Sequence, residues 1–225
     1  LLELAAGHPA ARILLQSGQL PLQVDPRSLA VDQSAALALV IDGARRDDVA
    51  TVSAVWPLLP AGAADQFGRT PLHHAADAGA AGVVSWLLAR SIEVDVRDAQ
   101  SITPLMLAAG AERPEAMTAL VDARANVAAI DAIGSSALFY AARQGRVAQA
   151  RQLVAAGVDP RQRNAGGWTA ADYALQPEQR AMADYLAQQG LRPARRQVAT
   201  ATRAAPPGVL RRHVAGDAYA GWPDV

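Results

Sequence analysis

The sequence predicts an all-α solenoid of stacked helix-turn-helix units, and three observations support that prediction. A 33-residue period runs through the middle of the 225-residue chain. Within each period, apolar residues recur at helical spacing in two short segments. Turn residues and helix-capping residues fall at fixed positions between those segments. A unit of this size cannot bury its apolar face alone, so the stacking of neighbouring units has to supply the core.

The period is set by turn segments that fall in register. Successive segments begin 33 residues apart, at Asp65, Asp98, Asp131 and Asn164. Shortly after each of them comes a helix-start segment: Thr70-Pro71-Leu72, Thr103-Pro104-Leu105, Ser136-Ala137-Leu138 and Thr169-Ala170-Ala171. We therefore predict four units, at residues 65–97, 98–130, 131–163 and 164–190.

Each unit is expected to contain two short antiparallel helices. Thr70 and Thr103 are suited to cap the first helix, and the proline that follows occupies its first position, where a missing N–H costs nothing. Gly79 and Gly145 stand where first helices should end in the left-handed conformation. The small Ala pairs, such as Ala75-Ala76, let neighbouring first helices approach closely.

In these residues the sequence resembles the ankyrin-repeat family. The resemblance is carried by residues 65–76, which read DQFGRTPLHHAA, and is echoed by TPLMLAA at residues 103–109. It implies an ankyrin solenoid in which His73 braces the turn through the threonine hydroxyl and the backbone. It also implies that the polar last unit caps the C-terminal end of the stack. Two departures are Ser101 in place of a turn glycine and Glu112 in place of a glycine after the first helix.

The segments that flank the units are less regular. We interpret residues 1–64 as a divergent N-terminal cap that contains a degenerate helix pair at residues 34–63. Residues 191–225 form an Arg-rich C-terminal extension, in which six Arg and two Asp give a net charge of +4. The rest of the chain, with 15 Arg and 19 acidic residues, carries −4. The extension is expected either to stay solvated or to dock on the acidic body or on a partner.

Composition excludes several functional classes. The chain is 51% hydrophobic and 19% charged, as globular proteins are, and its formal net charge of zero gives no footprint of a nucleic-acid binder. Without Cys it has no disulfide, thiolate nucleophile or thiolate metal site. The longest uncharged apolar stretch, residues 49–64, is shorter than the ~20 residues of a membrane helix and contains two prolines. We therefore expect no transmembrane segment.

The use of basic residues points to a source. All 21 basic residues are Arg, and the chain has no Lys, which suggests a gene from a GC-rich bacterium. The chain begins at Leu1 rather than Met, so the sequence is compatible with a signal segment that has been cleaved off. The expected compartment is the bacterial cytoplasm or the periplasm, and the sequence does not decide between them.

No catalytic or metal-binding constellation emerges from the sequence. His73, His74 and Asp77 lie within one helical turn, but metal sites normally need three or four converging ligands, so a structural role is favoured. Ser135-Ser136 falls at a turn with no partner base nearby in the sequence. The glycines are turn residues at repeat spacing and form no phosphate loop. We expect no enzyme activity, no catalytic residue, no metal, no cofactor and no small-molecule substrate.

What remains is a binding surface. In the ankyrin-repeat family, the turn tips and the exposed side of the first helices grip partners along a concave face. Carrying these positions over, unit by unit, selects the candidate partner-binding residues Phe67, Arg69, Asp77, Arg97, Gln100, Ile102, Ile130, Ile133, Arg143, Gln144, Arg163 and Trp168. Aromatic residues and Arg dominate binding hot spots. For Ile102 and Ile130, sideways packing between adjacent turns is the competing interpretation.

The leading hypothesis is a non-enzymatic protein-binding module that holds a folded bacterial partner on the concave ankyrin face. Its use would be that of an immunity protein, an inhibitor or a chaperone of a partner enzyme, toxin or effector. This preference rests on the family resemblance and on the stand-alone architecture. The alternative is a scaffold or adaptor whose Arg-rich tail contacts an acidic partner or a membrane surface. No nucleic-acid partner is expected.

Overall fold

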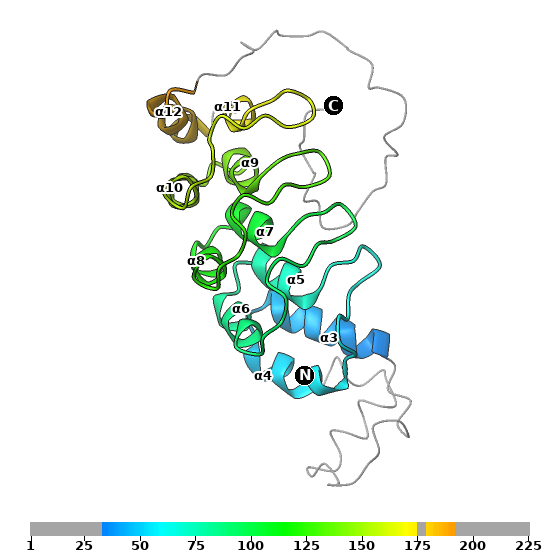
Figure 1. The fold of residues 1–225 in the computed structure, drawn as a ribbon. Coiled ribbons are helices and arrows are strands. Elements are labelled where there is room, and N and C mark those ends of the chain that lie inside the picture. Colours follow the sequence, from blue (N-terminus) through cyan, green and yellow to red (C-terminus); the bar gives the residue numbers. More distant parts are fainter. Residues whose placement is uncertain (1–32, 175–178, 192–225) are drawn as a thin grey trace, which may run out of the picture.

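The chain folds as a stack of helix pairs, which confirms the predicted all-α solenoid (Figure 1). The computed structural model describes residues 33–174 and 179–191. Within these residues no strand forms, and the isolated bridge between Ile130 and Ser136 is the one β-type pairing. The predictions for residues 1–32 and for the tail from residue 192 lie outside the described residues.

The helices alternate between two layers (Figure 1). The inner layer contains the first helix of each pair: α3 (Gln33–Arg45), α5 (Pro71–Asp77), α7 (Pro104–Gly110), α9 (Ala137–Arg143) and α11 (Ala170–Tyr173). The outer layer contains the second helices: α4 (Val49–Val55), α6 (Ala81–Leu88), α8 (Glu115–Asp122), α10 (Val147–Ala155) and α12 (Arg180–Gln188), with the short 3-10 helix η1 (Trp56–Leu58) following α4.

Long loops connect each outer helix to the next inner helix and project beyond the inner layer (Figure 1). We call these loops fingers and number them along the chain: finger 1 is residues 59–70, finger 2 is 89–103, finger 3 is 123–136 and finger 4 is 156–169. Because the inner helices lie side by side, the fingers also lie in a row.

The inner helices begin and end largely as the sequence predicts. The Thr103 hydroxyl oxygen accepts a hydrogen bond from the Met106 N–H at 3.4 Å, and Pro104 occupies the first helical position of α7. Gly79 and Gly145 have φ values of +68° and +67°, so both end their helices in the left-handed conformation. Ser101, which replaces a turn glycine, adopts the same conformation at φ +60°.

The core lies between the two layers and between successive units. Leu87, Leu120, Leu153 and Leu186, one from each of four outer helices, are fully buried. They pack with inner-helix leucines and with the Ala pairs in one continuous apolar cluster. The core is therefore shared between neighbours, as a solenoid of small units requires.

Of two adjacent carboxylates in the first described helix pair, one caps a helix of that pair and the other joins it to the next pair. Asp48 caps α4 by accepting a hydrogen bond from the Thr51 N–H at 3.0 Å. The Asp47 carboxylate instead accepts from the N–H groups of Val83 at 2.8 Å and Gly82 at 3.3 Å, in the first turn of α6. The pair α3–α4 thus occupies the position of a further unit of the stack.

Candidate protein-binding surface

Each finger carries a turn that one side chain organises. One side-chain oxygen in each turn accepts hydrogen bonds from the backbone N–H groups two and four residues later, at 2.8–3.1 Å. The residues that supply this oxygen are the period-setting ones: Asp65, Asp98, Asp131 and Asn164. The sequence register is therefore a register of turn acceptors.

Backbone hydrogen bonds join the tips of successive fingers. The Ala99 N–H donates to the Phe67 carbonyl oxygen at 2.9 Å, and the Ala132 N–H donates to the Gln100 carbonyl oxygen at 2.9 Å. The same bond, at 2.8 Å, joins the Ala165 N–H to Ile133. The tips therefore form one connected edge, which limits independent movement of the fingers.

A second polar atom of the turn residue ties three of the fingers to the inner layer. The partners lie nine residues later in the chain and contact the turn residue at 3.0 Å: Asp65 with His74, Asp131 with Tyr140 and Asn164 with Tyr173. Side chains with a polar end at this inner-helix position thus hold fingers 1, 3 and 4.

Finger 2 is held differently, and this overturns one prediction. Its turn residue Asp98 has Leu107 nine residues later, which offers no polar group. Arg69 of finger 1 takes that place, and its Nε donates to Asp98 Oδ2 at 3.1 Å. Arg69 is only 5% exposed, so the prediction that it lies on the turn surface is wrong. The available signal was Leu107 at a position where the other units have His or Tyr.

Ile102 is also removed from the exposed surface. It is fully buried, in agreement with the competing interpretation that it packs sideways between adjacent turns. Its N–H donates to Asp98 Oδ1 at 2.9 Å, and its carbonyl oxygen lies 3.0 Å from His73 Nε2. Ile102 therefore belongs to the support of finger 2 and is not available to a partner.

His73 has the bracing role that the family resemblance implies. Its Nδ1 accepts from the Thr70 N–H at 3.1 Å, so the proton is on Nε2 and is donated to the carbonyl oxygen of Ile102. Burial lowers the pKa of His73, which keeps the ring neutral. The neutral ring links the start of α5 to finger 2.

His74 has a defined role that the sequence did not reveal. Its Nδ1 lies 3.2 Å from Arg45 Nη2, and its Nε2 lies 3.0 Å from Asp65 Oδ2. Burial, together with the charge of Arg45, lowers the pKa of His74 to about 4. Asp77 is exposed and takes no part in these contacts. In the described part of the chain, no group of three or more His, Cys, Asp or Glu side chains is arranged to hold a metal ion.

The exposed candidates include three side chains at one repeated finger position. Arg97, Ile130 and Arg163 follow one another at 33-residue spacing in fingers 2, 3 and 4, and all three are exposed. We call them the finger row. Ile130 is 43% exposed and is the one exposed large apolar side chain among the described residues. Arg97 Nη1 donates to the Ile130 carbonyl oxygen at 2.9 Å, which places two members of the row in direct contact.

The finger tips supply half-buried side chains. Phe67, Gln100 and Ile133 occupy the same position in fingers 1, 2 and 3. Trp168 of finger 4 is also half-buried, and its ring lies 6.4 Å from that of Tyr173 in edge-on geometry. These side chains are partly used by the fold and keep part of their surface accessible.

The remaining candidates lie at the C-terminal ends of the inner helices. Asp77 and Gln144 are exposed, and Arg143 is half-buried. Desolvation raises the pKa of Asp77, although the charges of Arg69, Arg45 and Arg143 oppose this shift.

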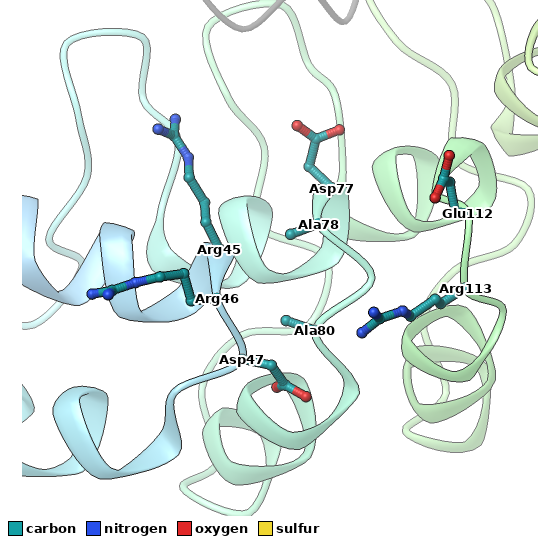
Figure 2. A pocket seen from close by; sticks show the side chains of 8 residues that line it. All are labelled: Arg45, Arg46, Asp47, Asp77, Ala78, Ala80, Glu112 and Arg113. Atoms are coloured by element: carbon teal, nitrogen blue, oxygen red, sulfur yellow. The ribbon is translucent and has the colours of Figure 1, made fainter.

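Beside Asp77 lies an open groove of about 470 Å³ (Figure 2). In Figure 2 the side chains of Arg45 and Asp77 project from neighbouring inner helices toward the same side. The lining residues are Arg45, Arg46, Asp47, Asp77, Ala78, Ala80, Glu112 and Arg113. Charges of both signs line the groove, so it has no uniform preference for one sign of ligand charge.

The helix pairs and fingers agree with the protein family that the sequence matches. The family model of ankyrin repeats (3 copies) matches residues 49–131. The chain is an ankyrin-repeat protein. The matched segment runs from α4 to the turn residue of finger 3. The ankyrin fold continues beyond it, because finger 4 repeats the same turn hydrogen bonds. No curated protein matches the chain.

Ankyrin repeats generally mediate protein–protein interaction and are typically non-enzymatic binding modules. In the residues that the structure covers, no helix is long and apolar enough to cross a membrane. The ankyrin finger row, the half-buried tips and the inner-helix ends are the candidate contact surface, from which Arg69 and Ile102 are now removed.

Proposed function

We propose that this ankyrin-repeat protein is a non-enzymatic module that holds a folded protein partner against its fingers and the adjoining ends of its inner helices. The observation that carries the proposal is the exposure of Ile130 between Arg97 and Arg163 in the finger row. Arg is enriched in interface hot spots, and an apolar side chain between two arginines offers surface whose burial by a partner is favourable.

The rigidity of the fingers supports the proposal. Each tip is hydrogen-bonded to the next through its backbone. The inner layer holds the turn residues of fingers 1, 3 and 4, and Arg69 of finger 1 holds that of finger 2. A partner that binds such an edge does not have to order it first, so less binding free energy is lost. This arrangement suits a stable complex with one folded partner.

Within this proposal, we favour an immunity protein that inhibits a partner enzyme or effector. The alternatives are a chaperone or a scaffold for that partner. The support is the ankyrin architecture, which offers an extended contact face. Such a face has room for an interface of about 1,600 Å² in total.

The test uses partner capture with Ile130→Asp and a matched control. The control is Ser85→Asp, which adds the same carboxylate at an exposed position of the outer helix α6. We expect the native chain and the control to capture the same protein from a lysate of the source organism. We expect Ile130→Asp to weaken binding of that protein by about 2 kcal/mol or more.

Circular dichroism first establishes that both variants are folded. The captured protein is then purified, and its own activity is measured with and without the native chain. Loss of that activity distinguishes an inhibitor from a scaffold. Equal capture by both variants would remove the fingers as the contact surface.

A further inference from the structure

The carboxylates of the finger turns face inward. Asp65, Asp98 and Asp131 each accept two backbone N–H groups on one oxygen. Their second oxygens contact His74, Arg69 and Tyr140, respectively. These carboxylates are therefore occupied within the fold and are not offered to a partner.

The guanidinium groups of the finger row face outward. Arg97 Nη1 donates to the carbonyl oxygens of Ile130 at 2.9 Å and Ser101 at 3.4 Å, and Arg163 Nη1 donates to the carbonyl oxygen of Gly167 at 2.6 Å. In the described residues, neither guanidinium group forms an ion pair. The neutral carbonyl groups orient the two cations without neutralising them.

The finger row thus carries two cations and no carboxylate in a protein whose formal net charge is zero. The turn carboxylates Asp65, Asp98 and Asp131 are bonded inward, whereas Arg97 and Arg163 are exposed. The exposed acidic residues of fingers 2 and 4, Glu93 and Asp159, lie four residues before these arginines and outside the row. We infer that the finger row binds an acidic helix of the partner, in which two carboxylates flank one apolar side chain. The inference rests on the proposed function and specifies the chemistry of its partner.

The spacing of the row favours a helix as the occupant. Neighbouring packed helices lie 8–10 Å apart, so Arg97 and Arg163 are roughly 20 Å apart with Ile130 midway. A helix rises about 1.5 Å per residue, so seven residues cover about one unit and nearly complete two turns. Residues i, i+7 and i+14 therefore share one face and reach all three positions.

An extended strand does not match the row. It rises about 3.3 Å per residue, so about three residues would span one unit, and residues three apart point to opposite faces of the strand. The chain's own residues 191–225 are also unsuitable by charge, since they carry a net +4. Carboxylates at i and i+14 of a helix would instead meet the two guanidinium groups, which bind carboxylates in bidentate geometry.

The test is a selection from a displayed library of 21-residue helical peptides, randomised at positions 3, 10 and 17. The native chain is the bait, and the comparison bait is the double variant Arg97→Glu/Arg163→Glu. The matched control, Arg124→Glu/Arg180→Glu, reverses two exposed arginines that lie outside the finger row. Anionic vesicles and a single-stranded oligonucleotide are titrated against the same proteins.

We expect selected peptides to carry Asp or Glu at positions 3 and 17 and an apolar residue at position 10. Their affinity should fall about tenfold or more with the finger-row variant and stay unchanged with the control. The inference is overturned if no peptide is enriched, if the peptides show no acidic preference, or if the finger-row variant binds them equally. Binding of vesicles or oligonucleotide that only the finger-row variant loses would also overturn it, in favour of a general polyanion site.

The same selection separates this inference from the proposed function. Peptides that lose binding with Ile130→Asp but carry no carboxylates would leave the fingers as a binding surface and refute only the acidic helix. Peptides that bind Ile130→Asp and the finger-row variant as well as they bind the native chain would count against both.

Discussion

Replacing Arg69 by Ile tests how finger 2 is held. The Nε of Arg69 lies 3.1 Å from Asp98 Oδ2, and the Asp98 side chain has no exposed surface. Ile is the residue that the next unit has at this position, as Ile102. The substitution removes the cation and leaves the buried Asp98 Oδ2 without this partner. We therefore expect the free energy of unfolding to fall by about 3–5 kcal/mol.

A second substitution should recover part of that loss. In finger 3 the Tyr140 hydroxyl donates to Asp131 Oδ2 at 3.0 Å, and Leu107 stands at the equivalent position in finger 2. Leu107→Tyr in the Arg69→Ile background offers Asp98 the same donor. A hydrogen bond to a charged group contributes about 1.5–3 kcal/mol. With Arg69 still present, Leu107→Tyr only adds volume to a packed site and should cost about 1–3 kcal/mol.

The assay is urea unfolding at pH 7, followed by circular dichroism, for the native chain, the two single variants and the double variant. These four proteins form a double-mutant cycle, and we expect a coupling free energy of at least about 1.5 kcal/mol. Equal m-values are required, because partial unfolding of a repeat stack lowers them. A cost below about 1 kcal/mol for Arg69→Ile, or equal effects of Leu107→Tyr in both backgrounds, would refute the reasoning.

Further predictions concern protonation, glycine and the core. The pKa of His74 is about 4 in the folded chain against an ordinary 6.5, so its contribution to stability is present above pH 6.5 and is lost as the pH falls towards 4. His74→Gln should remove this part of the pH dependence, up to about 3 kcal/mol, as urea unfolding between pH 4 and 7 would measure. Gly68→Ala should destabilise by about 1–2 kcal/mol, because Gly68 has φ +76° and a Cβ would lie 3.2 Å from a backbone nitrogen of finger 2. Gly110→Ala should stabilise by about 0.5–1 kcal/mol, because Gly110 is helical and a Cβ would meet only ordinary contacts, and thermal melting of the two glycine variants should show opposite shifts. Leu120→Asp should unfold the stack, since Leu120 is fully buried between units, and loss of helical circular dichroism at 25 °C would show it.

The sequence sufficed for the architecture because the signals that set it are local. Thr103 and Pro104 start an inner helix through contacts within one turn of the chain. Asp131 shapes its finger through the N–H groups two and four residues later. These interactions repeat at a fixed spacing, so a single chain shows them several times over. The neutral, bracing role of His73 followed from the same local pattern together with the family resemblance.

The contact surface was less predictable, because the sequence shows which residues flank a turn but not which of those positions the neighbouring unit covers. Arg97 directly precedes a turn residue and is exposed, as Ile130 and Arg163 are. Arg69 follows a turn residue by four positions and is buried, as Ile102 and Ser135 are at the same repeat position. His74 likewise gains its partners from two other segments, at Arg45 and Asp65.

The sequence by itself therefore determined the repeat register, the starts of the first helices and the ankyrin family, since each depends on turn and capping interactions among residues close in the chain. Only the tertiary structure decided which charged side chains are exposed. A buried carboxylate is costly unless it is paired and hydrogen-bonded. For Asp98 the partner is Arg69, which lies 29 residues earlier, in the neighbouring finger. This long-range contact turns Arg69 inward, whereas Arg97, Ile130 and Arg163, at another repeat position, form the exposed row.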